Sequence, residues 1–108
     1  MTPPEIAQKL LAFYAGDPAR WTKGCYARNA DSVKLGSANH PTAACWCLHG
    51  AMRILPIPHT DQYAFAALWA ANHTPNWQDA GDALVEWNDA PERTFEEVVA
   101  RLQEIAAG

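Results

Sequence analysis

Helix boundary signals near the two ends of the chain constrain its fold more than any other feature. Thr2-Pro3-Pro4-Glu5 is a capping box, in which threonine caps the helix, proline takes the first helical position and glutamate reaches back. Thr94-Phe95-Glu96-Glu97 is a second capping box. Apolar residues at helical spacing follow each box: Ile6, Leu10, Phe13 and Tyr14 in the first segment, and Val98, Leu102, Ile105 and Ala106 in the second. We therefore predict a helix at each end, the first ending at Gly16. In the second, we expect an ion pair between Glu97 and Arg101.

Three further helices are predicted between these two. Pro41-Thr42 opens one that runs to about Leu55, where the prolines of LPIPH end it. The next begins at Thr60 or Asp61 and ends at residues 72–75. A shorter one covers residues 79–88. With 108 residues, the length of one domain, we predict a mainly α, compact single-domain bundle (1–108) of about five helices. The two end helices are expected to pack with the 43–55 helix.

Residues 22–41 form the exception to this helical pattern. The segment shows no helical period and is too long for an ordinary connection between helices. Residues 25–28 and 32–35 can form a short β-hairpin across Asn29-Ala30-Asp31. Because long ordered loops often carry function, this segment is a candidate site, expected to lie over one end of the bundle.

Charge and composition exclude several classes of function. The net charge is −4, and the eight Lys and Arg residues are scattered, which argues against nucleic-acid binding. No apolar stretch approaches the roughly 20 residues of a membrane span, and no signal-peptide pattern begins the sequence. Three cysteines without secretion signals favour reduced thiols and a cytoplasmic location.

The segment AACWCLHG raises the question of a metal site, because Cys25, His40, Cys45, Cys47 and His49 lie close together in the sequence. Two residues apart in a helix, Cys45 and Cys47 would point about 200° from each other and could not share an ion, unless the helix starts later than Thr42. Cys45 and His49 would share a face. We expect no metal and no cofactor, and keep a zinc-binding domain as an alternative.

A cysteine nucleophile is a second interpretation of the same segment. With Thr42 as the helix cap, Cys45 would lie in the first turn, where unpaired amides favour the thiolate. Cys45 and His49 are therefore weak candidates for the catalytic residues of a thiol-dependent hydrolase or transferase. No third orienting residue can be named, and no phosphate loop or Ser–His–Asp order appears. We therefore lean against an enzyme.

Helix packing is the interpretation that we favour for this segment. Cys47 falls on one helical face with apolar neighbours, and Gly50 beside it would allow another helix to approach closely. The members of this face are Ala44, Cys47, Leu48, Ala51 and Leu55. We therefore predict that Cys47 lies in the core, and that Cys47→Ser costs more stability than Cys45→Ser.

The segment WNDAPERT is a strong turn signal between two predicted helices. A structural corner, anchored by Trp87 and capped by Thr94, is the favoured interpretation. A ligand-facing pair of Asp89 and Arg93 is the alternative.

Three stretches of the sequence stand out together: RWTKGCYARNADS (20–32), AACWCLHGAMRIL (43–55) and WNDAPERTFEEVVARLQEIA (87–106). In combination they resemble a family of small bacterial and phage proteins of unknown function. The family pattern has Trp-Cys-x-x-Gly-Ala and Trp-Asn-Asp motifs, and commonly Asp-Gly where this chain has Asp31-Ser32. The resemblance implies a bacterial or viral origin and one compact helical domain, but no catalytic residue. The candidate binding residues are Trp21, Arg28, Asn29, Asp31, Asp89 and Arg93.

Taken together, these features favour a small non-enzymatic protein-binding or inhibitory module of bacterial or phage origin. We expect a protein partner, and neither nucleic acid nor membrane. The thiol-dependent enzyme and the zinc-binding domain are the alternatives.

Overall fold

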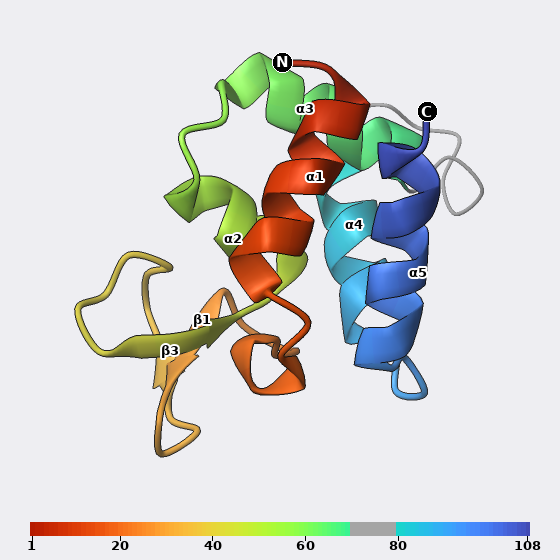
Figure 1. Ribbon diagram of the computed structural model, residues 1–108. Helices are drawn as coiled ribbons and strands as arrows, with labels where there is room; N and C mark the ends of the chain where they lie inside the picture. Colours follow the sequence, from red (N-terminus) through yellow and green to blue (C-terminus); the bar gives the residue numbers. More distant parts are fainter. Residues whose placement is uncertain (70–79) are drawn as a thin grey trace.

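The computed structural model describes residues 1–69 and 80–108, which form five α-helices and a small antiparallel sheet (Figure 1). The elements are α1 (Pro3–Tyr14), the 3-10 turn η1 (Pro18–Arg20), β1 (Ala27–Asn29), β2 (Lys34–Leu35), β3 (Ala43–Trp46), α2 (Leu48–Ile54), α3 (His59–Trp69), α4 (Ala80–Asp89) and α5 (Phe95–Ala106). The mainly helical prediction is confirmed, with a three-stranded sheet added to it. Within the described residues, no helix is both long enough and apolar enough to cross a membrane.

The capping boxes start α1 and α5 as predicted. In α1, the side chain of Thr2 accepts a hydrogen bond from the Glu5 amide, and in α5 Thr94 does the same for Glu97. After Tyr14, Ala15 and Gly16 both adopt left-handed backbone angles, which end α1. The predicted ion pair of α5 is wrong. Glu97 forms an ion pair at 3.0 Å with Arg93, which lies four residues earlier in the chain. Arg101 pairs with Glu104 instead.

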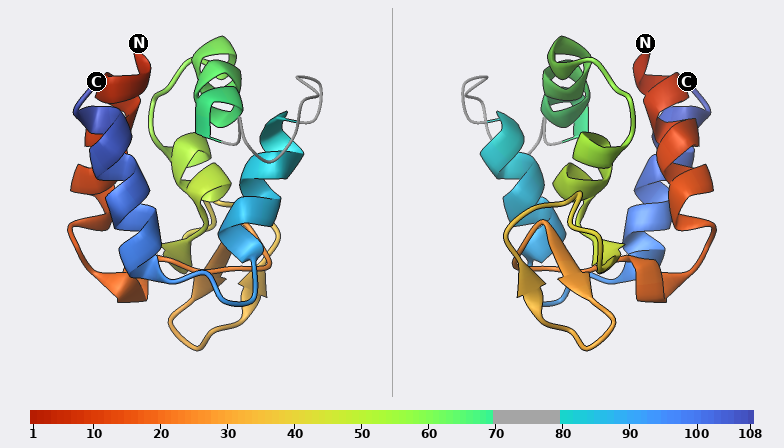
Figure 2. Two further views of the ribbon diagram at one scale, coloured as in Figure 1. Left: turned by 90° about the vertical axis from the view of Figure 1, so that its right-hand side faces the viewer. Right: turned by 90° about the vertical axis from the view of Figure 1, so that its left-hand side faces the viewer.

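The helices form two side-by-side pairs, α1 with α5 and α3 with α4, and α2 lies between them (Figure 2). The end helices are predicted to pack with the 43–55 helix, but α1 and α5 pack chiefly against each other, and α2 packs chiefly against α4. The fully buried side chains of this core include Ile6, Leu10, Tyr14, Leu48, Met52, Phe65, Leu84, Val98 and Leu102. The predicted helix at 79–88 is confirmed by α4, and the end signal at 72–75 lies outside the described residues.

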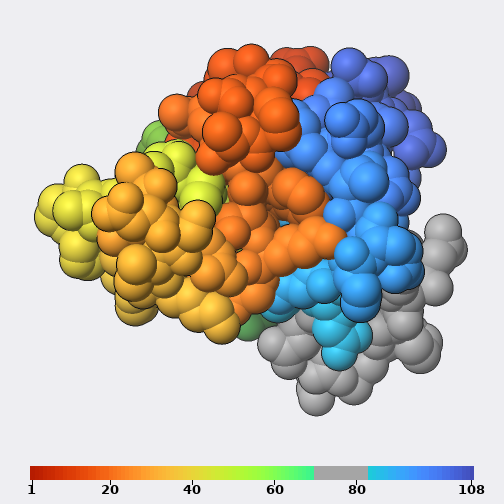
Figure 3. All heavy atoms as spheres, turned by 90° about the horizontal axis from the view of Figure 1, so that it is seen from below, coloured from red at the N-terminus to blue at the C-terminus, as the bar shows by residue number. Residues whose placement is uncertain are grey.

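The sheet has the strand order β2-β1-β3 and lies at one end of the helices (Figure 1). The predicted hairpin is confirmed: Ala27 lies opposite Leu35 and Arg28 opposite Lys34. Seen from below, the hairpin and the segment up to β3 project as a lobe beside the helices (Figure 3). The predicted position of residues 22–41 over one end of the bundle is therefore confirmed.

The predicted helix from Thr42 to Leu55 is wrong in its first third. Residues 43–46 form strand β3, which pairs with β1, so that Arg28 lies opposite Cys45 and Ala27 opposite Trp46. The helix begins only at Leu48, with Cys47 as its cap. The physical reason is that β1 supplies hydrogen-bond partners to residues 43–46, and a short apolar run alone does not distinguish strand from helix.

Candidate functional site

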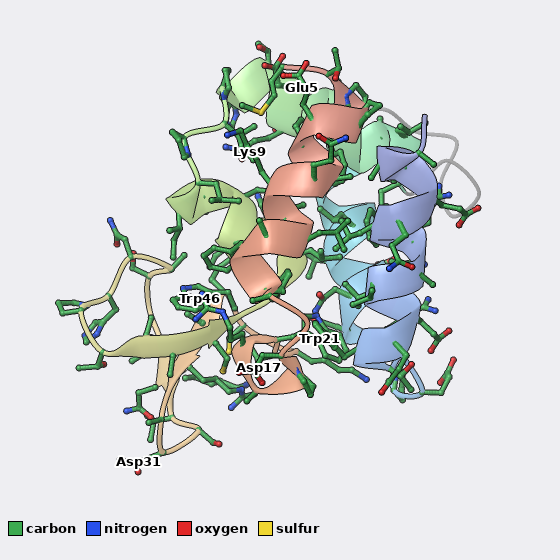
Figure 4. The ribbon with its side chains drawn as sticks, viewed as in Figure 1. Glu5, Lys9, Asp17, Trp21, Asp31 and Trp46 are labelled. Carbon is green, nitrogen blue, oxygen red and sulfur yellow. The ribbon has the colours of Figure 1, made fainter. Side chains whose placement is uncertain are left out.

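Asn88, the one buried polar or charged residue among those described, joins three segments of the chain. Its side-chain oxygen accepts hydrogen bonds from the indole of Trp21 at 2.7 Å and from the Leu48 amide at 3.1 Å. Its amide group donates to the carbonyl oxygen of Thr22 and to the carboxylate of Asp89. All hydrogen-bonding positions of the amide are therefore used, as a buried asparagine requires. Trp21 lies at the foot of the helices, where this junction forms (Figure 4).

Asp89 extends the junction to the start of the hairpin segment. The same carboxylate oxygen that binds Asn88 also accepts the Gly24 amide at 3.0 Å. Lys23 donates to the carbonyl oxygens of Ala90 and Pro91, beyond the end of α4. Of the candidate binding residues, Trp21 and Asp89 thus lie close together, and their contacts described so far hold the fold.

Arg28 and Asn29 shape the hairpin from within. The guanidinium of Arg28 donates to the Thr22 hydroxyl and to the carbonyl oxygens of Lys23 and Ser32. The side-chain oxygen of Asn29 accepts the amides of two loop residues. Asp31, by contrast, is exposed at the tip of the hairpin, far from Trp21 and Trp46 (Figure 4). A binding role for these three residues stays a prediction.

Arg93 belongs to the corner between α4 and α5. Its guanidinium lies 3.8 Å from the centre of the Trp87 ring, donates to the Trp87 carbonyl oxygen and pairs with Glu97. The structural corner is therefore confirmed. Arg93 and Asp89 form no ion pair with each other among the described residues, and their ligand-facing role stays a prediction.

The cysteines of AACWCLHG occupy different elements. Cys47 is buried, as predicted, and its sulfur accepts the Gly50 amide at 3.3 Å as the cap of α2. Burial raises the pKa of the Cys47 thiol to about 11. A thiol held protonated at neutral pH is a poor nucleophile, so the geometry gives no support to Cys47 as a catalytic residue.

Cys45 lies in β3, and its thiol contacts the Arg28 carbonyl oxygen at 3.8 Å. The argument that placed Cys45 in a first helical turn, on one face with His49, is therefore wrong. His49 lies in the first turn of α2, with its ring edge-on to Tyr26 at 5.3 Å between centres. Among residues 1–69 and 80–108, no three His, Cys, Asp or Glu side chains lie close enough to hold a metal ion.

Two adjoining hollows meet at Arg53, on the outer side of α2. The larger, about 360 Å³, is bounded by residues 36–39 and Tyr26, and the smaller, about 80 Å³, reaches Tyr63. Both are lined by Arg53, His59 and Gln62. We call this continuous surface the Arg53 groove, defined by Tyr26, residues 36–39, Arg53, His59, Gln62 and Tyr63. The 36–42 segment and the connection from α2 to α3 lie on the same side of the molecule (Figure 1).

Arg53 differs from the other arginines in its bonding. Arg20, Arg28, Arg93 and Arg101 each donate hydrogen bonds to protein oxygens. Arg53 makes no hydrogen bond or ion pair with any described residue; its guanidinium lies over the ring of Tyr26, 5.0 Å from the centre. Its planar donors therefore remain available to a ligand.

The walls of the Arg53 groove are held in place by residues behind it. The indole of Trp46 donates to the Ala38 carbonyl oxygen at 2.8 Å, which ties segment 36–39 to β3. The amide group of Gln62 donates to the carbonyl oxygens of Met52 and Ile57. His59 and Tyr63 contact each other edge to face, and Tyr63 is half exposed. The groove is thus built before any partner arrives, which lowers the entropic cost of binding.

No sequence pattern points to Arg53, Gln62 or Tyr63, because the groove joins segments far apart in the chain. The one usable signal is the 22–41 segment predicted as a candidate site, which contains Tyr26 and residues 36–39 of the groove. That signal finds one wall of the groove.

Comparisons with known proteins define the family but not an activity. The model of a family of unknown function (DUF6197) matches residues 7–108, which is nearly the whole chain. No curated protein and no solved structure matches this chain. The resemblance to a family of unknown function is therefore confirmed, and the chain belongs to DUF6197.

Proposed function

We propose that this protein is a small non-enzymatic binding module, and that its Arg53 groove binds an acidic segment of a partner protein. The observation that carries the proposal is the guanidinium of Arg53, which faces two adjoining hollows and makes no hydrogen bond with any described residue. A cation exposed beside aromatic rings is complementary to a carboxylate flanked by apolar groups.

The surroundings of Arg53 support a peptide as the ligand. Tyr26 and Tyr63 are 37% and 50% exposed, and tyrosine contributes large contact areas at interfaces at low entropic cost. The side-chain oxygen of Gln62 makes no hydrogen bond with any described residue, and could accept a backbone amide of the partner. The chain as a whole has a net charge of −4, so it does not attract acidic ligands at long range. The attraction of an acidic peptide must therefore come from the local positive charge in this groove.

A displayed library of random peptides tests the proposal. The immobilised protein is panned, with counter-selection against Arg53→Gln. We expect the selected peptides to contain Asp or Glu next to an aromatic or aliphatic residue. Selection of peptides without acidic residues, or of none that distinguish the variant, would overturn the proposal. Arg53-dependent binding of a single-stranded RNA hexamer, with no such binding by peptides, would overturn it in favour of nucleic acid.

Lys34→Gln supplies the matched control, because it removes one positive charge from an exposed residue of β2. Arg53 also lies in the last turn of α2, where a cation complements the helix dipole. The unfolding midpoint of Arg53→Gln is therefore measured beside its binding. Loss of binding in a variant that remains folded supports the groove as the binding site.

A further inference from the structure

We propose that a separate pocket beside Asp89 binds an organic cation, a guanidinium or alkylammonium group on an aliphatic chain. The pocket has a volume of about 280 Å³ and is lined by Asp89, by Tyr26 and His49, and by Cys25, Leu35 and Val85. It adjoins the two hollows at Arg53, because Tyr26 lines both this pocket and the larger hollow, and His49 lines both this pocket and the smaller one.

Only one of the two carboxylate oxygens of Asp89 accepts hydrogen bonds from the described residues. Its Oδ1 atom accepts the Gly24 amide at 3.0 Å and the Asn88 amide group at 2.8 Å. Its Oδ2 atom makes no hydrogen bond with any described residue, and Asp89 forms no ion pair among them. Two donors therefore fix the carboxylate in position while its second oxygen remains available to a ligand.

Lys23 and Arg28, the cations that flank pocket residues 24–26 in the chain, are committed elsewhere. The ammonium of Lys23 donates to the carbonyl oxygens of Ala90 and Pro91, and the guanidinium of Arg28 to Thr22, Lys23 and Ser32. Asp89 is also the last residue of α4, where the helix dipole disfavours a negative charge. A bound cation would relieve this unfavourable placement as well as neutralise the carboxylate.

The remaining walls suit the aliphatic stem of such a ligand. Leu35 and Val85 are apolar and half-buried, and the ring of Tyr26 is 37% exposed. Lysine and arginine side chains bury their methylene groups against surfaces of this kind while the charged head reaches a polar partner. The geometry therefore fits the end of a lysine or arginine side chain better than a bare metal ion or a neutral alcohol.

A nuclear magnetic resonance titration with n-butylguanidinium tests the proposal on the full chain. We expect saturable shifts of the Gly24, Cys25 and Tyr26 amide signals, and no saturable shift with 1-butanol. Asp89→Asn keeps the Oδ1 acceptor and removes the charge, so the affinity should fall by about fivefold or more. Equal binding by 1-butanol, or unchanged affinity in folded Asp89→Asn, would overturn the proposal.

Three further variants keep the test decisive. Val85→Phe fills the pocket from α4 and leaves the Asp89 and Asn88 side chains unsubstituted, so it should abolish binding of n-butylguanidinium; retained binding would overturn the proposal. Glu96→Gln removes the same charge from an exposed residue in the first turn of α5 and should bind as the wild type does. Arg53→Gln should also bind n-butylguanidinium normally, so the failure of one site is distinguishable from the failure of the other.

Discussion

At the scale of single residues, Cys47 has two roles, burial in the core and capping of α2, of which the sequence predicts only the first. It is buried, and its sulfur also caps α2 by accepting the Gly50 amide. Serine is among the best capping residues, so Cys47→Ser should stay within about 1 kcal/mol of the wild type. Cys47→Ala removes the cap and should lower the free energy of unfolding by about 1–2 kcal/mol. Urea unfolding of both variants checks this.

Packing alone predicts that the buried hydroxyl of Cys47→Ser destabilises the protein. The capping role of the Cys47 sulfur changes this expectation, because a serine side chain can cap α2 in its place. Cys45→Ser is the control, since Cys45 is half-buried and caps no helix. If serine and alanine at position 47 prove equally destabilising, the sulfur contributes by packing and the capping role is refuted.

Ser32, in the loop of the hairpin, adopts a backbone conformation that glycine takes more readily than serine. Its φ angle is 66°, in the left-handed region that side chains other than glycine adopt at a cost of about 1 kcal/mol. Both of its backbone hydrogen bonds, from its amide to Asn29 and from Arg28 to its carbonyl, would survive a change to glycine. Ser32→Gly should therefore stabilise the protein by up to about 1 kcal/mol.

Thermal unfolding measures this effect, with Ala30→Gly as the control in the same turn. Ala30 has no positive φ, so glycine there gains nothing and should slightly destabilise the protein. A lower melting temperature for Ser32→Gly than for the wild type would contradict the account of this turn.

At the scale of elements, Gly50 governs how α2 meets the start of the sheet. A Cβ atom at this position would overlap the carbonyl oxygen of Tyr26, a backbone atom that also accepts the Cys47 amide. A close approach at Gly50 is thus confirmed, although the approaching segment is the chain before β1 and not a helix. Because backbone cannot move aside as a side chain can, Gly50→Ala should cost about 1–3 kcal/mol despite the better helix propensity of alanine.

Gly36→Ala is the matched control for this prediction. Nothing lies within 4 Å of the added carbon there, and its φ is not left-handed. Chemical denaturation of the two variants should separate them clearly. A Gly50→Ala protein as stable as the wild type would show that α2 and β1 are not held as closely as the structure has them.

The elements also show which parts of the fold local sequence can predict. Helices α1 and α5 were predictable because caps and apolar stripes act within a few residues of each other. Strand β3 was not, because its hydrogen-bond partners lie in β1, more than a dozen residues earlier. The hairpin loop was predictable from Asn29, whose side chain closes the turn through local hydrogen bonds.

At the scale of the whole molecule, the Asn88 junction joins α4 to the start of α2 and to the chain before the sheet, and the Arg53 groove opens beside α2. Trp46 and Gln62 position its two sides from different elements. Arg53 is 27 positions from Tyr26 in the chain, so only the folded structure brings the two together. This is why the candidate site was not predictable from sequence while most helices were.

The most direct test of the Arg53 groove is the affinity of a selected acidic peptide for wild type and Arg53→Gln, measured by calorimetry. Hydrogen bonds to a charged group contribute about 1.5–3 kcal/mol, so the variant should bind about tenfold or more weakly. Lys34→Gln should change the affinity by less than about twofold, because an exposed charge outside the groove contributes little. Equal affinities of wild type and a folded Arg53→Gln protein would contradict the assignment of this groove as the binding site.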